Sequence, residues 1–184
     1  VRYSGTNPKN YVEFGNDGEL WRIIGIFNVK DSNGNTSKKI KIMRDKAIGS
    51  YSWDATGNDN WGINNWADSD LKNELNGDYL NTALTSNKTN WYNSYWVSSS
   101  DSIAYSRNGV FNYTMVIKSK YQKMIDSVVW NLGGWSTTSS VSAKTMYEKE
   151  KSSTVYSGMP STWTGKVALV TASDYGYAST DTTC

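Results

Sequence analysis

Six aromatic, acidic and amide side chains between residues 53 and 66 form the densest group of residues able to bind a ligand: Trp53, Asp54, Asp59, Asn60, Trp61 and Trp66. Indole rings stack on flat apolar faces, and neighbouring carboxylates and amides exchange hydrogen bonds. This combination suits sugar binding, so we predict a candidate ligand-binding site. Burial of the tryptophans in the core is the competing interpretation, because Trp is a highly buried residue type.

The same loop carries four oxygen-bearing side chains of the kind that calcium binds: Asp54, Asn58, Asp59 and Asn60. Hydrogen bonding within Asx turns is the favoured explanation of these residues. We therefore predict no cofactor and no metal site, with calcium as the one cation that the pattern suggests. Residues 31–35 also crowd oxygen ligands, but an EF-hand loop counted from Asp31 would have Thr36 where glycine is required, so we predict a hairpin turn.

Histidine is absent from the whole sequence. Its absence excludes Ser-His-Asp and Cys-His catalysis and most zinc sites. The single cysteine, Cys184, is the last residue and has no nameable partner base. We predict a protein that is not an enzyme, with a polysaccharide-active enzyme that uses Asp54 and Asp59 as one alternative.

Asp68 and Asp70 are the other acids at a suggestive spacing. A glycosidase needs two carboxylates facing one cleft, whereas residues two apart on a helix point about 200° away from each other. Both aspartates instead favour the start of a helix, where the dipole is positive. We expect Asn65 and Asp68 to cap this helix and Asp68 to pair with Lys72 one turn later.

Charge and composition restrict the partners. The net charge is +2 and no long basic run occurs, so nucleic acid is not expected. No window of about 18 apolar residues is present, so we predict no direct membrane insertion in this chain. The aromatic content is 14%, beside abundant Asn, Ser, Thr and Gly. Such a composition is typical of extracellular modules.

The secondary structure predicted for the first 45 residues is an antiparallel meander. Residues 10–15, 19–29 and 38–45 have strand patterns, and a tight turn at residues 16–18 contains Asp-Gly. Gly25 lies inside an apolar run and predicts either a β-bulge or a close backbone approach.

Helices are predicted after the aromatic loop. Ala67, Leu71 and Leu75 share one helical face, interrupted at Asn76-Gly77 before a second short helix. An amphipathic stripe predicts a long helix over 117–132, ending at the glycines 133–134. Residues 142–153 predict a short surface helix, and 165–178 a buried strand followed by a helix that Thr171 and Asp174 cap. Short strands are expected at 94–99 and 109–116.

Four blocks of the sequence together resemble a bacterial extracellular domain family of unknown function: "NYVEFGNDGELWRIIGIFN", "KIMRDKAIGSYSWD", "WADSDLKNELNGDYLN" and "WTGKVALVTASDYGYA". The resemblance covers nearly the whole chain and is weakest over 85–116. It implies a fold similar to C-type-lectin-like and formylglycine-generating-enzyme-like domains, in prepilin-like or anchored proteins of gut bacteria. It offers no catalytic motif, and family members usually continue into a further strand where this chain ends at Cys184.

We therefore predict an α+β, C-type-lectin-like domain, with an irregular antiparallel sheet, two main helices and long loops. It would be one domain over residues 1–184, truncated at the C-terminal side. The predicted function is recognition or adhesion at the bacterial cell surface. The expected partner is a glycan or a host or bacterial surface protein, and the second alternative is a structural domain of a pilin-like filament.

Overall fold

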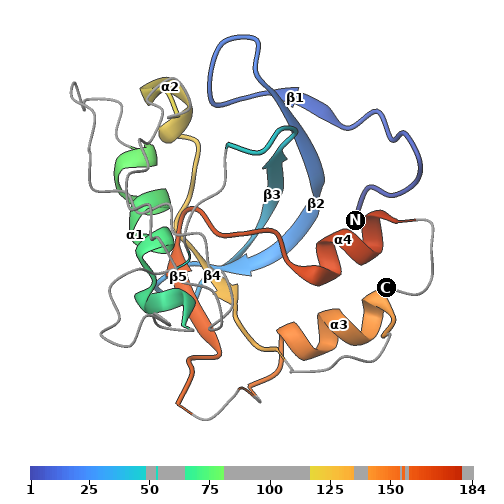
Figure 1. Cartoon of the computed structure of the whole chain (residues 1–184), viewed down its shortest axis with the longest axis vertical. Helices are drawn as coiled ribbons and strands as arrows, with labels where there is room; N and C mark the ends of the chain where they lie inside the picture. Colours follow the sequence, from blue (N-terminus) through green and yellow to red (C-terminus); the bar gives the residue numbers. More distant parts are fainter. Residues whose placement is uncertain are drawn as a thin grey trace, which may run out of the picture. The chain divides into compact units, whose positions relative to one another are not determined.

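The computed structural model describes residues 1–48, 53, 65–80, 117–134, 141–153, 155 and 158–179 (Figure 1). These residues form a mixed α/β structure with small antiparallel sheets and a few helices, which confirms the predicted combination of elements. The chain divides into two compact units, residues 1–46 with 125–184, and residues 47–124. The prediction of a single domain stays a prediction, and each unit is described by itself.

A three-stranded antiparallel sheet forms the first part of unit 1: β1 (Tyr11–Glu13), β2 (Leu20–Lys30) and β3 (Thr36–Arg44), in that order. It confirms the predicted meander. Gly18 and Gly34 have positive φ angles of 70° and 84° in the two connecting turns. In the second turn the Asp31 carboxylate accepts hydrogen bonds from the backbone of Asn33 and Asn35, at 2.8 and 2.9 Å. The predicted hairpin turn is therefore confirmed.

A β-bulge and a close backbone approach, the two alternatives predicted for Gly25, are both present. The register of β2 against β3 shifts between Ile23 and Gly25, as in a β-bulge. A Cβ atom at Gly25 would lie 2.3 Å from the carbonyl oxygen of Val1, because the first residues of the chain run alongside β2. Only glycine allows this approach of the two backbones.

The long helix predicted over 117–132 is wrong. Its first half contains only α2 (Ser119–Gln122), and its second half is a strand, β4 (Val128–Asn131), paired antiparallel with β5 (Thr162–Gly165). The run from Val128 to Trp130 consists of good strand formers, and its pairing partner lies more than thirty residues later in the chain. The helical spacing of the apolar residues contains no information about that partner strand.

Two helices of unit 1 confirm their predictions, α3 (Ala143–Glu150) and α4 (Ala172–Ala178). They pack side by side, with the rings of Tyr147 and Tyr177 edge to face at 6.3 Å (Figure 1). Thr171 and Asp174 form the predicted capping box at the start of α4. The strand predicted before this helix is wrong, because β5 ends at Gly165 and the residues at 166–170 have no strand pairing.

Unit 2 contains the remaining described elements: η1 (Trp66–Asp68), α1 (Asp70–Asn76), η2 (Asp78–Leu80) and α2. Gly77 separates α1 from η2, as predicted. Of the predicted apolar stripe, Leu75 is buried and Leu71 is half-buried. The amide of Ile117 donates to the carbonyl of Tyr79 at 3.0 Å, and both side chains are buried.

The predicted strands at 94–99 and 109–116 lie outside the described residues. Among the described residues, the buried apolar side chains belong to two sets. One set comes from unit 1: Phe14, Trp21 and Ile24. The other comes from unit 2: Trp66, Leu75, Tyr79 and Ile117.

Candidate functional site

Two of the six predicted binding residues, Trp53 and Trp66, lie next to each other in unit 2. Their ring centroids are 5.5 Å apart, with 59° between the ring planes. Trp66 is only 6% exposed, whereas Trp53 is 39% exposed. The amide of Leu71 donates to the carbonyl oxygen of Trp53 at 3.0 Å and ties this loop residue to α1. One indole is therefore held against a second, buried one.

Polar caps fix the buried ring at the start of η1. The Asn65 side chain accepts from the amide of Ala67 at 3.0 Å and donates to the Asp68 carboxylate at 2.5 Å. The buried Ser69 hydroxyl donates to the Trp66 carbonyl oxygen at 3.1 Å and accepts a hydrogen bond from the backbone amide of Lys72 in α1. These bonds hold the backbone on both sides of Trp66 in one conformation.

The capping role predicted for Asn65 is confirmed by its hydrogen bond from the Ala67 amide. Asp68 accepts from the Asn65 side chain and, among the described residues, forms no backbone cap of its own. The predicted ion pair between Asp68 and Lys72 is replaced by another contact. The Lys72 ammonium donates to the side-chain oxygen of Asn73 at 2.6 Å. Asp70 lies in the first turn of α1, where a negative charge is favourable.

The other four predicted binding residues, Asp54, Asp59, Asn60 and Trp61, lie outside the described residues. The loop proposed for calcium does too. Within the described ranges, no group of three or more Cys, Asp or Glu side chains is placed to hold a metal ion. No helix in the described part of the chain is long and apolar enough to cross a membrane.

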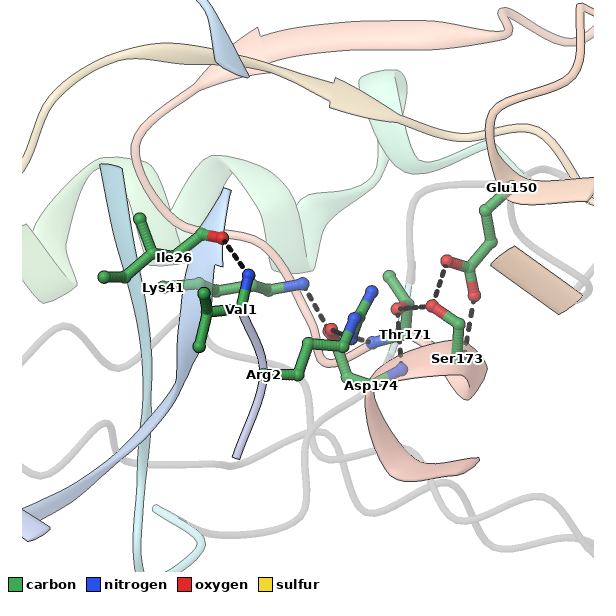
Figure 2. A network of polar contacts seen from close by, with 8 residues as sticks. All are labelled: Val1, Arg2, Ile26, Lys41, Glu150, Thr171, Ser173 and Asp174. Atoms are coloured by element: carbon green, nitrogen blue, oxygen red, sulfur yellow. Dashed lines mark hydrogen bonds and ion pairs between the residues drawn. The ribbon is translucent and has the colours of Figure 1, made fainter. Parts of the chain in front are cut away.

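A polar network around Asp174 was not predicted from the sequence beyond its role in the capping box. The Asp174 side chain is 1% exposed, and Arg2 Nη1 lies 3.1 Å from its Oδ1 (Figure 2). Its Oδ2 accepts hydrogen bonds from the Lys41 ammonium and from the backbone amide of Thr171, the latter at 3.2 Å. Arg2 is 172 residues away in sequence and Lys41 is 133, so no local pattern could reveal this network.

The Asp174 carboxylate is held ionised. Burial raises its pKa, but the charge of Lys41, the hydrogen bond from that ammonium and the hydrogen bonds at Thr171 outweigh burial, and the net pKa is lowered from 3.8. A carboxyl group with a lowered pKa is a poor general acid at neutral pH. Asp174 is thus suited to anchoring cations.

The Arg2 guanidinium is surrounded by aromatic rings as well as the carboxylate. It lies 4.6 Å from the ring centroid of Phe27, 5.0 Å from that of Tyr147 and 4.5 Å from that of Tyr177. Cation–π attraction to several rings and an ion pair to one carboxylate act on the same group. We call the set Phe27, Tyr147, Tyr177 and Asp174 the arginine socket.

Glu150 extends the network from α3 to α4. Its carboxylate accepts from the Ser173 amide at 2.9 Å and from the Ser173 hydroxyl at 2.5 Å (Figure 2). Ser173 is fully buried and lies in the first turn of α4. Glu150 thus satisfies an amide that the start of a helix leaves without an intrahelical acceptor.

The two groups differ in what they can do. The arginine socket combines a buried carboxylate with three half-buried rings and is occupied by the chain's own Arg2, whereas the Trp53 ring offers apolar area to solvent. Comparisons of the chain with known protein families, curated proteins and solved structures found no match.

Proposed function

We propose that this protein is a non-enzymatic recognition module, exported to the bacterial cell surface, that binds a glycan through the Trp53 indole. The observation that carries the proposal is the 39% exposure of a ring that a second, buried tryptophan supports. A large aromatic side chain that is oriented by packing and still open to solvent loses little conformational freedom when a sugar stacks on it.

Within this proposal, Trp66 supports the binding ring, because at 6% exposure it has little surface to offer a ligand. Asp54, Asp59, Asn60 and Trp61 would supply the hydrogen bonds and the second apolar face. The fold in this proposal is of the C-type-lectin-like kind, in which long loops carry the ligand site. A protein of the host or of another bacterium is the other partner that fits an exposed aromatic.

A glycan array probed with the wild-type chain and a Trp53→Ala variant tests the proposal. We expect the variant to bind about tenfold more weakly, which corresponds to about 1.4 kcal/mol of lost stacking. Its melting temperature should stay close to that of the wild type. Tyr175→Ala is the matched control, because it removes another exposed aromatic ring, 74% exposed and on α4 of unit 1.

Equal glycan binding by the wild type and the Trp53→Ala variant would contradict the proposal, as would binding of no glycan and no surface protein. A second candidate is a structural domain of a pilin-like filament, which the burial of Trp66 and Trp21 favours. That candidate predicts no glycan binding by the wild type and a clear loss of stability in Trp53→Ala. The array and the melting curve together separate the two.

A further inference from the structure

The first five residues dock onto the rest of unit 1, with residues 1–3 alongside β2 and Gly5 against the end of α4. Arg2 forms an antiparallel bridge with Gly25 of β2. The backbone contacts of this segment are Val1 to Ile26 at 3.2 and 2.8 Å, Tyr3 to Ile24 at 3.0 Å, and Gly5 to Ala178 at 3.1 Å. Binding of an extended segment along a strand of a sheet is a recurrent mode of peptide recognition.

One side chain supplies the specificity of this docking. The Arg2 guanidinium fills the arginine socket, which combines rings from β2, α3 and α4 with the buried carboxylate. A planar cation that both stacks on aromatic faces and pairs with a carboxylate is the chemistry of guanidinium. The socket is therefore matched to arginine within an extended backbone.

The socket does not depend on Arg2 alone for its charge balance. Asp174 also receives the Lys41 ammonium and the Thr171 amide, so its negative charge stays compensated when Arg2 leaves. Tyr147 and Tyr177 contact each other directly across α3 and α4. Both observations favour a socket that persists when it is vacated.

The tether of the docked segment lies on the surface. Thr6, Asn7 and Lys9 are exposed, between the segment and β1. A tether of this kind can swing away or be cut without removing buried groups. Docking in cis is favoured only by the effective concentration that the tether imposes, of the order of mM for a short flexible linker.

We propose that the arginine socket and the adjoining backbone of β2 at Ile24–Ile26 form a receptor for an extended, arginine-bearing segment, and that its partner in trans is residues 1–5 of a second copy of this chain. A second copy carries the same residues and restores every contact that the first copy gives up, which is the low-cost route to association by exchange of an identical element. The proposal is independent of glycan binding.

Mixing two full-length variants tests this directly. In Arg2→Ala the socket and the β2 backbone are intact, but the segment lacks its arginine. In Gly25→Ala the segment keeps Arg2, but the added Cβ would lie 2.3 Å from the Val1 carbonyl oxygen and blocks docking. We expect each variant alone to be monomeric and the mixture to form a one-to-one heterodimer, measured by size-exclusion chromatography with light scattering.

A labelled peptide of residues 1–9 provides the second measurement, by fluorescence anisotropy. We expect Arg2→Ala to bind it about tenfold more tightly than the wild type does, because the competitor in cis is weakened. The same peptide with alanine in place of arginine should bind about tenfold more weakly. Arg22→Ala is the control, since Arg22 stacks on Tyr11 and pairs with Asp45 away from the socket.

If either variant fails to fold by circular dichroism, a wild-type chain with a protease site inserted at residues 6–9 decides the question. After cleavage, the labelled peptide should replace the resident segment. The proposal is overturned if the folded variants form no heterodimer, if the arginine and alanine peptides bind alike, or if the cleaved chain does not exchange its segment.

Discussion

Asp174 in unit 1 and Trp66 in unit 2 are both buried, but they are held in different ways. The partners of Asp174 come from the first residues of the chain, from β3 and from the start of its own helix. The contacts described for Trp66 include the Trp53 ring and the caps at residues 65–69.

Burial therefore has a different role in each of the two units. A network of charges drawn from distant segments connects the parts of unit 1, and the chain's own first residues cover it. A buried ring with capped backbone on both sides can support an exposed neighbour, and so serve recognition.

Replacing Asp174 by Asn should cost about 3 to 5 kcal/mol of unfolding free energy, because it leaves two largely buried cations without their counter-charge. Urea denaturation followed by circular dichroism measures the loss. Asp126→Asn is the matched control, since its ion pair with Lys39 at 2.5 Å is exposed and worth about 1 kcal/mol or less. Similar losses of unfolding free energy in the two variants would show that the buried network stabilises the fold no more than an exposed ion pair does.

Within the tryptophan pair, Trp66→Ala should cost about 3 to 5 kcal/mol, as large-to-small changes of buried aromatics do. Trp53→Ala should cost clearly less, because its ring is 39% exposed. The same denaturation experiment compares them, with Trp66→Phe as the conservative control. Equal losses from both alanine variants would show that the pair is one packing unit and would weaken Trp53 as a binding surface.

Acid should reduce the stability of unit 1 through Asp174. Its pKa is lowered in the folded state, so its stabilising contribution is complete above the ordinary value of 3.8 and is lost as the pH falls through the lower folded pKa. Urea midpoints measured between neutral pH and about pH 3 should fall less steeply for Asp174→Asn than for the wild type. Parallel curves would place the acid sensitivity in other carboxylates.

Several patterns confined to neighbouring residues were predicted correctly, although the ion pair between Asp68 and Lys72 was not. The meander of β1, β2 and β3 follows from alternation and turn residues, and the capping box at Thr171 and Asp174 follows from a spacing of three. The close approach at Gly25 was predicted because only glycine tolerates it.

Patterns that depend on a distant partner were not predicted. The stripe over 117–132 fits a helix by spacing, yet Val128–Asn131 is a strand because β5 offers it hydrogen bonds. Periodicity cannot distinguish these outcomes when apolar residues are dense. At the candidate site, composition identified Trp53 and Trp66 together but could not tell which ring is exposed.

Residue types and short spacings were enough to predict the first sheet, the cap at the start of α4, the hairpin turns and the absence of histidine chemistry. The burial of Trp66 beside the more exposed Trp53, and the meeting of Arg2, Lys41 and Asp174, emerge only in the folded chain. Burial and charge pairing depend on segments far apart in the chain, whose approach no short stretch of sequence encodes.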